Sequence, residues 1–192
     1  TKEMVSGCIR VPDDDLRIVN GGSFTAEGLF KWMPGAVGGR TSDLCHYVMA
    51  KHATNSQYVA LYLDAKANLR TNVRTAADKT AKEVPLTDPP WNPSFDDGAW
   101  HHVAFVYNEE QKQSSVYVDG RIFRRLNGMT LDRDAGYSTT YGNYFYFATG
   151  YGESRYYQMN DGYVDAIRVT KRVLCPQEFL THAEPTARLE LF

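Results

Sequence analysis

Residues 97–107, Asp-Gly-Ala-Trp-His-His-Val-Ala-Phe-Val-Tyr, and residues 114–120, Ser-Ser-Val-Tyr-Val-Asp-Gly, are the part of the sequence that decides the fold. Residues 101–107 are apolar on both faces beyond the two histidines, which is typical of a central strand covered on both sides. Asp119-Gly120 ends an alternating run, and this dipeptide favours the type I′ turn of a β-hairpin, which needs positive φ at both central positions. The stretch therefore predicts long antiparallel strands with a hairpin at 119–120.

Outward from this stretch, residues 24–33 alternate with period two, so that one set of side chains faces each side of a strand. The first set is Phe24, Ala26, Gly28, Phe30 and Trp32, and the second is Thr25, Glu27 and Lys31. We expect further strands at 44–51, 57–63, 66–74, 144–149, 163–170 and 187–192, and one short helix near 176–181 that begins at Pro176. Short strands separated by turn signals predict an all-β, antiparallel two-sheet sandwich.

The composition fits this class. The chain has 192 residues, of which 43% are hydrophobic and 13% aromatic, with 13 tyrosines. A sandwich of this length is commonly one domain, and aromatic side chains suit strands. We expect a single domain over residues 1–192. Because the sequence begins at Thr1 without an initiator Met, we interpret it as an excerpt of a larger multidomain protein.

Charge and hydropathy exclude two classes of partner. Lys and Arg total 21 against 23 Asp and Glu, a net charge of −2, whereas a nucleic-acid binder needs a strongly basic surface. Residues 121–125 hold three arginines, which we interpret as a solvated strand edge. There is no run of 18 apolar residues, so we expect no membrane span.

Three segments, in order, carry a family resemblance. They are Phe24-Thr25-Ala26-Glu27-Gly28-Leu29-Phe30-Lys31-Trp32, Asp97-Gly98-Ala99-Trp100-His101-His102-Val103-Ala104 with Tyr117-Val118-Asp119-Gly120, and Gly162-Tyr163-Val164-Asp165-Ala166-Ile167-Arg168-Val169 with Arg172-Val173-Leu174-Cys175-Pro176-Gln177-Glu178-Phe179. Together they resemble the laminin-G-like domains of the concanavalin A-like lectin/glucanase superfamily over about residues 20–182. The resemblance implies a jelly-roll sandwich and a general binding role, and it names no ligand. Ala166 and Thr170 depart from the family pattern.

No residue pattern in the sequence predicts a catalytic site. The superfamily's retaining glycosidases use a short Glu-x-Asp-x-Glu strand, because their two carboxylates must lie about 5–5.5 Å apart, and no such triplet exists in the sequence. A polysaccharide lyase is the enzymatic alternative, since residues 146–158 superficially resemble a lyase strand, but the spacing to Gln158 differs. We expect no catalytic residues in this domain.

The densest chemical feature is the Tyr-rich region 137–163. Large, rigid and amphipathic tyrosines beside Arg, Asn or Gln suit sugar rings and protein interfaces. The predicted ligand-binding residues are Tyr151, Arg155, Tyr156 and Tyr157, together with Trp91 in the proline-rich connection 75–99. For Tyr144 and Tyr146 the alternative stays open that they simply cover a sheet.

Calcium is a further hypothesis. Superfamily relatives often hold Ca²⁺ with loop carboxylates, and Asp132-Arg133-Asp134 has the alternate spacing that ligation favours. Asp132 and Asp134 are the predicted ligands, and the alternative is that they form Asx turns.

Other residues are expected to be structural. Adjacent His101 and His102 should point to opposite faces of a strand, so we expect ordinary hydrogen-bonded histidines rather than a shared metal site. Trp100 should anchor the core between the sheets. Cys8, Cys45 and Cys175 are expected to be buried inert thiols, and any bridge would join Cys8 to Cys175.

These observations predict a non-catalytic, carbohydrate-binding module that is attached to a larger secreted or cell-surface protein such as a glycoside hydrolase. Its partners would be a carbohydrate or glycoconjugate and the neighbouring domains of the same chain. The alternative is a protein-interaction or spacer domain, and a polysaccharide lyase is the third reading.

Overall fold

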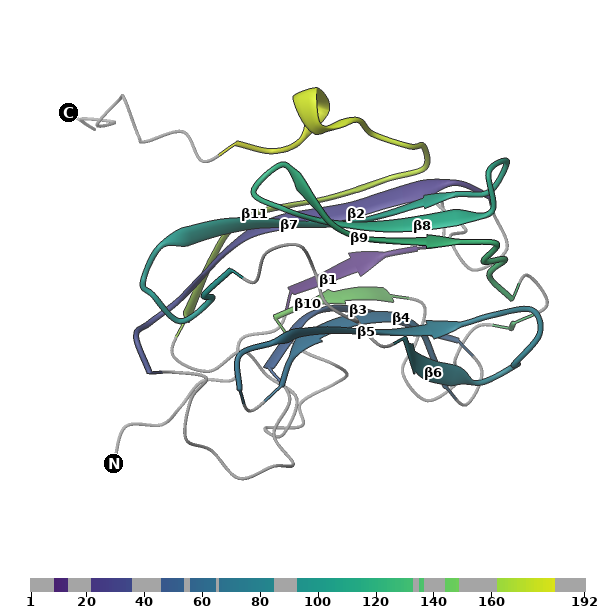
Figure 1. The fold of residues 1–192 in the computed structure, drawn as a ribbon, viewed down its shortest axis with the longest axis horizontal. Helices are drawn as coiled ribbons and strands as arrows, with labels where there is room; N and C mark the ends of the chain where they lie inside the picture. Colours follow the sequence, from purple (N-terminus) through teal and green to yellow (C-terminus); the bar gives the residue numbers. More distant parts are fainter. Residues whose placement is uncertain are drawn as a thin grey trace.

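The computed structural model describes residues 9–13, 22–35, 46–53, 56–64, 66–84, 93–132, 135–136, 144–148 and 162–181. These residues form two stacked antiparallel sheets, drawn as the upper and lower layers in Figure 1. Among them, no helix has the length and apolar character needed to cross a membrane.

The six-stranded sheet has the order β1 (Ile9–Pro12), β10 (Tyr144–Phe147), β3 (His46–Ala53), β4 (Ser56–Leu63), β5 (Leu69–Arg74) and β6 (Ala81–Val84). The five-stranded sheet has the order β11 (Gly162–Thr170), β2 (Phe24–Trp32), β7 (Trp100–Asn108), β8 (Gln113–Val118) and β9 (Arg121–Asn127). The all-β sandwich is therefore confirmed. β1 and β6 were not predicted, because four-residue strands show too little alternation, and residues 187–192 lie outside the described part.

The core lies between the sheets and follows the period-two pattern. Phe24, Ala26, Phe30 and Trp32 of β2 are 0% exposed, as the alternation of residues 24–33 predicts. Phe145 and Phe147 of β10 meet them from the other sheet, and Phe24 packs edge-on against Phe145. Burying a large aromatic side chain removes 150–250 Å² or so from water, so this layer dominates the stability of the fold.

At Gly28, β11 lies close to β2. β11 shifts its register between Val164 and Ile167, opposite Gly28. A Cβ at Gly28 would lie 2.8 Å from the ring of Phe30 and 3.1 Å from the carbonyl oxygen of Ala166. The irregularity in β11 therefore depends on the absence of a side chain here.

Residues 171–181, which we call the strap, lie on the outer side of the five-stranded sheet, with the three-ten turn η3 (Pro176–Glu178) at its top in Figure 1. The short helix predicted near 176–181 is this turn. Leu174 and Phe179 of the strap pack on Ala104, Val106 and Tyr117 to form a second, smaller apolar cluster. The outer face of β2 and β7 is therefore buried along most of its length.

Two side-chain predictions were wrong. Trp100 pairs with Lys31 and is half-buried on the outer face, because its neighbour His101 takes the inward position opposite Phe30. Trp32 is fully buried in the core instead. Cys175 was expected to be buried but is exposed and free of a disulfide, since it begins η3 at the surface. Cys8 and Cys45 lie outside the described residues.

Candidate functional site

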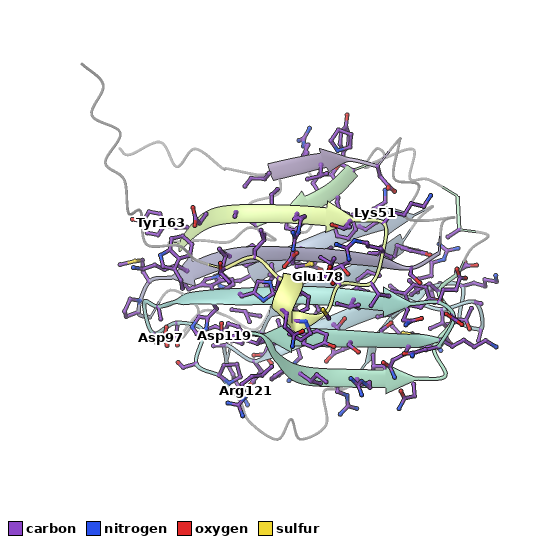
Figure 2. The ribbon with its side chains drawn as sticks, turned by 90° about the horizontal axis from the view of Figure 1, so that it is seen from above. Lys51, Asp97, Asp119, Arg121, Tyr163 and Glu178 are labelled. Atoms are coloured by element: carbon purple, nitrogen blue, oxygen red, sulfur yellow. The ribbon has the colours of Figure 1, made fainter. Side chains whose placement is uncertain are left out.

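At one end of the sandwich, which we call the Tyr163 end, β2, β6 and β10 end and β3, β7 and β11 begin. Tyr163 marks this end in Figure 2, and Lys51 marks the opposite end. In the five-stranded sheet, Gly162 begins β11 opposite Trp32, and Trp100 begins β7. In the six-stranded sheet, β4 ends at Leu63 opposite Leu69.

The predicted ligand-binding residues Tyr151, Arg155, Tyr156, Tyr157 and Trp91 all lie outside the described residues, so their positions stay predictions. Their flanking residues are described. Segment 149–161 runs from Ala148 to Gly162, and segment 85–92 runs from Val84 to Pro93. The strands that precede these segments, β10 and β6, end at the Tyr163 end, and the strands that follow them, β11 and β7, begin there.

The outer face of the six-stranded sheet is rich in tyrosine. In β10 the two phenylalanines point into the core, so Tyr144 and Tyr146 alternate to the outer face. Tyr146 is 3% exposed, and the guanidinium carbon of Arg10 lies 5.8 Å from the centre of its ring. The ring of His52 packs edge-on against it at 6.1 Å. Tyr146 therefore covers the sheet, while Tyr144 is half-buried.

A second tyrosine pair lies on the same face closer to the Tyr163 end. Tyr47 and Tyr62 pair in register across β3 and β4, and their rings stack with centroids 5.3 Å apart. They are 4% and 8% exposed and pack around Ala50 and Ala60. The outer face of this sheet is thus a packed aromatic layer, and its polar side chains lie at the edge of that layer.

Arg70 is the centre of the polar group at this edge. Its Nε donates to Asp64 Oδ2 at 2.9 Å, and its Nη1 donates to Glu83 Oε1 at 3.3 Å. The hydroxyl of Tyr62 donates to the other oxygen of Glu83, also at 3.3 Å. The side chains of Arg70 and Glu83 are 34% and 47% exposed. The group therefore presents a cation and a carboxylate next to solvent, and the buried Tyr62 donates to that carboxylate.

Asp64, in the connection between β4 and β5, holds Arg70 in place. Asp64 Oδ1 accepts hydrogen bonds from the backbone N–H groups of Lys66 and Asn68. Burial alone would raise the pKa of Asp64, but the N–H of Asn68 and the guanidinium of Arg70 hold it below its ordinary value. Asp64 is thus a fixed anion that orients Arg70.

His101 forms a second polar cluster at the Tyr163 end. Its Nδ1 lies 3.0 Å from Asp119 and its Nε2 lies 3.2 Å from Asp97, and both carboxylates belong to turns. Burial would lower the pKa of His101, but Asp119 and Asp97 raise it above its ordinary value. The ring also packs on Phe95 at the edge of the core. His101 therefore joins two turns, as an ordinary hydrogen-bonded histidine at a sheet end.

His102 points to the opposite face, as its adjacency to His101 predicts. Its Nε2 lies 2.8 Å from Glu27, which is fully buried. Glu27 also accepts hydrogen bonds from Arg168 Nε at 2.6 Å and from the backbone N–H of Leu180 at 3.0 Å. Burial would raise the pKa of Glu27, but His102, Leu180 and Arg168 hold it below its ordinary value. This network fastens the strap and uses the carboxylate for structure.

Asp132, one predicted calcium ligand, is 1% exposed and lies at the end opposite Tyr163. Arg74 Nε donates to one of its oxygens at 2.8 Å and Lys79 Nζ to the other at 2.7 Å. A calcium ion would have to compete with both cations. Asp134 lies outside the described residues, so the predicted pair stays untested. Within the described part of the chain, no group of three or more His, Cys, Asp or Glu side chains forms a metal-binding cluster.

The arrangement supports binding better than catalysis. The alternative function, a polysaccharide lyase, would need a tyrosine with His and Arg nearby. Tyr146, His52 and Arg10 do lie together on the outer face. However, Tyr146 and His52 are each only 3% exposed, so a polymer does not reach them in this conformation. Both carboxylates of the Arg70 group are ion-paired to that arginine.

Sequence reasoning missed the Arg70 group. The signal was present in residues 69–74, where Leu69, Thr71 and Val73 alternate with Arg70, Asn72 and Arg74. That alternation places two arginines on the outer face of a strand. The partners Asp64 and Glu83 come from a loop and from the unpredicted β6, so no local pattern in the sequence joins them.

Comparison with known proteins gives one family. The sequence model of the concanavalin A-like lectin/glucanases superfamily matches residues 9–179. No curated protein sequence matches the chain.

Several solved structures share the fold at low sequence identity. The K499G mutant of NanB sialidase from Streptococcus pneumoniae is similar with a TM-score of 0.59 and 14% identity, over 90% of this chain and 25% of that chain. The CBM40 of the IT-sialidase of Ruminococcus gnavus, bound to α2,6-sialyllactose, has a TM-score of 0.56 and 11% identity over 91% of this chain and 92% of that one. The SAP-like pentraxin of Limulus polyphemus has a TM-score of 0.51 and 13% identity, over 82% and 68% of the two chains. The chain thus spans a quarter of the length of the sialidase.

Proposed function

Because the chain belongs to the concanavalin A-like lectin/glucanases superfamily, we propose that it is a non-catalytic carbohydrate-binding module that contacts its glycan at the Tyr163 end. The observation that carries this proposal is that the Arg70 group lies at the same end of the sandwich as the residues that flank segments 85–92 and 149–161. We call these two the aromatic segments, because they contain the predicted aromatic ligand-binding residues. Arginine, carboxylate and tyrosine hydroxyl groups supply donors and acceptors for sugar hydroxyls, and aromatic rings supply an apolar surface.

The likeness to a sialidase-associated CBM40 supports a role in a larger enzyme. We propose that this domain is part of a secreted or cell-surface protein, such as a glycoside hydrolase, and that it concentrates the parent on glycan-bearing surfaces. Its other partners would then be the neighbouring domains of the same chain.

Isothermal titration calorimetry tests the proposal. The domain is titrated with α2,3- and α2,6-sialyllactose, with lactose, and with a broad set of neutral oligosaccharides. We expect saturable binding to at least one glycan. The proposal fails if the folded domain binds none of them.

A matched pair of variants tests the place of binding. Arg70→Gln removes the exposed cation of the Arg70 group, and we expect at least a tenfold loss of affinity, which is about 1.4 kcal/mol. Arg125→Gln removes an exposed arginine of β9 and is the control, with affinity unchanged. Equal effects of the two variants would remove the Arg70 group from the site.

A further inference from the structure

The Arg70 group carries more negative than positive charge. Arg70 Nη2 lies 2.8 Å from Asp64 Oδ2, and its Nη1 lies 3.3 Å from Glu83 Oε1. The hydrogen bond and charge of Asp64, together with the charge of Glu83, raise the pKa of Arg70 against the effect of burial. Among the described residues, the exposed Lys66 contacts the group through its backbone N–H. At neutral pH the three side chains therefore hold one cation between two anions.

Glu83 is held beside Arg70 from a second direction. Glu83 pairs with Asn72 across β5 and β6, which places it diagonally to Arg70 on the same face of the sheet. Tyr62 pairs with Arg70 across β4 and β5, and its hydroxyl donates to Glu83 Oε2 at 3.3 Å. Tyr62 is itself fixed by stacking on Tyr47. The carboxylate of Glu83 thus has one partner on each oxygen and loses both if it turns away.

Both exposed members of the group keep hydrogen-bonding capacity. A guanidinium has five N–H groups, and the described partners of Arg70 use one on each nitrogen, so Nη1 and Nη2 each keep a second one. A carboxylate oxygen has two acceptor sites, and Glu83 uses one on each oxygen. Arg70 and Glu83 are 34% and 47% exposed. The group therefore offers donors and acceptors side by side.

This combination suits a neutral polyhydroxyl ligand better than an anionic one. A sugar hydroxyl both donates and accepts, so two adjacent hydroxyls accept from the guanidinium and donate to Glu83. A ligand carboxylate only accepts, so it uses the N–H groups and leaves the free acceptor sites of Glu83 without a donor. It also lies next to the like charge of Glu83, with Asp64 behind the guanidinium.

We propose that the Arg70 group selects a neutral sugar through adjacent hydroxyls and rejects sugars that carry a carboxylate at that position, such as sialic and uronic acids. Glu83 is the residue that sets this preference, and Tyr62 is a positioning residue that holds it. The inference rests on the proposed function, since it requires that the domain binds glycans at the Tyr163 end. It separates this chain in ligand class from the similar CBM40 that was solved with α2,6-sialyllactose.

Matched neutral and acidic glycans test the preference by isothermal titration calorimetry. The first pair is β-1,4-mannotetraose and the β-1,4-mannuronate tetrasaccharide, and the second is cellotetraose and the β-1,4-glucuronate tetrasaccharide. Within each pair, a carboxylate replaces a hydroxymethyl group. Lactose and α2,3-sialyllactose form the third pair. We expect a neutral glycan to bind at least tenfold more tightly than its acidic counterpart at low salt. Added salt should narrow the difference, because it screens the repulsion.

Variants assign the preference to Glu83. Glu83→Gln keeps the shape of the side chain and an oxygen for Tyr62 but removes the negative charge, so the affinities for the two members of a pair should become similar. Tyr62→Phe frees Glu83 from its second partner and should also narrow the difference. Glu110→Gln is the control, because it removes an exposed carboxylate between β7 and β8, at the opposite end, and changes the net charge equally. Its affinity ratio should equal that of the unchanged domain.

The outcomes separate this inference from the proposed function. If an acidic glycan binds as tightly as its neutral counterpart, or if Glu83→Gln and Glu110→Gln leave the same affinity ratio, the inference is wrong and carbohydrate binding stands. If Arg70→Gln and Arg125→Gln have equal effects on a bound neutral glycan, the Arg70 group is not the site and the inference falls with it. If the folded domain binds none of the six probes or the wider glycan set, both proposals fail.

Discussion

Glu27→Gln is the substitution that tests most severely how the strap is held. The carboxylate is 0% exposed and has three partners, namely His102, Arg168 and the N–H of Leu180. The amide keeps the shape of the side chain but removes the charge, and its NH₂ group meets donors where the carboxylate accepted hydrogen bonds.

The expected cost follows from the burial of the partners. Breaking a buried ion pair by removing one member costs about 3–5 kcal/mol. Arg168 is 37% exposed and recovers part of its hydration, so we expect the lower end, about 3 kcal/mol. For a domain of this size, 1 kcal/mol corresponds to a shift of about 2–4 °C, so the melting temperature should fall by about 6–12 °C.

Urea unfolding followed by tryptophan fluorescence measures this change. Glu83→Gln is the matched control, since it makes the same substitution in an ion pair whose two members are 34% and 47% exposed. An exposed pair contributes up to about 1 kcal/mol. The reasoning is refuted if Glu27→Gln and Glu83→Gln lower the free energy of unfolding by the same small amount.

Three further predictions concern other parts of the sandwich. Gly28→Ala should destabilise the domain by about 1–3 kcal/mol, because its Cβ would lie 2.8 Å from the Phe30 ring and 3.1 Å from the carbonyl oxygen of Ala166 in β11, and an unchanged urea midpoint would contradict these two close contacts. The pKa of His101 is raised by Asp119 and Asp97. Its contribution to stability is therefore fully present below the unfolded pKa of about 6.5 and is lost as pH rises through the higher folded pKa. His101→Gln should accordingly cost more stability at pH 5.5 than at pH 9, and a cost that does not vary with pH would show that the two turns do not hold a charged ring. The pKa of Asp132 is lowered by Lys79 and Arg74 against the effect of burial, so its contribution is present above about pH 3.9 and is lost as pH falls through the folded pKa. Asp132→Asn should lower the free energy of unfolding at pH 7 by about 2–3 kcal/mol and have little effect near pH 2, and chemical denaturation at the two pH values checks this.

The layers of the fold could be predicted from the sequence because alternation in a strand is a local property. The inward set of β2, from Phe24 to Trp32, follows directly from period two. The position of Trp100 was not predicted correctly, because its size suggested the core. In β7, however, His101 pairs with the inward-facing Phe30, and alternation then places Trp100 on the outer face. Side-chain volume is a weaker guide than register where a strand begins.

The candidate site was only partly predictable. The adjacent histidines were expected on opposite faces, and the structure places them so, with His101 on Asp119 and His102 on Glu27. The Arg70 group joins Asp64 of a loop, Arg70 of β5 and Glu83 of the edge strand β6, and such a contact depends on the order of strands in the sheet.

Chemical-shift mapping of the ¹⁵N-labelled domain during titration with a bound glycan tests most directly whether the ligand is held at the Tyr163 end. We expect the largest backbone shifts in residues 93–100 and 162–163, which follow the segments 85–92 and 149–161, and in residues 62–70, which contain the Arg70 group. Shifts confined to the far end of the sandwich, around Lys51 and Asp132, would contradict the account.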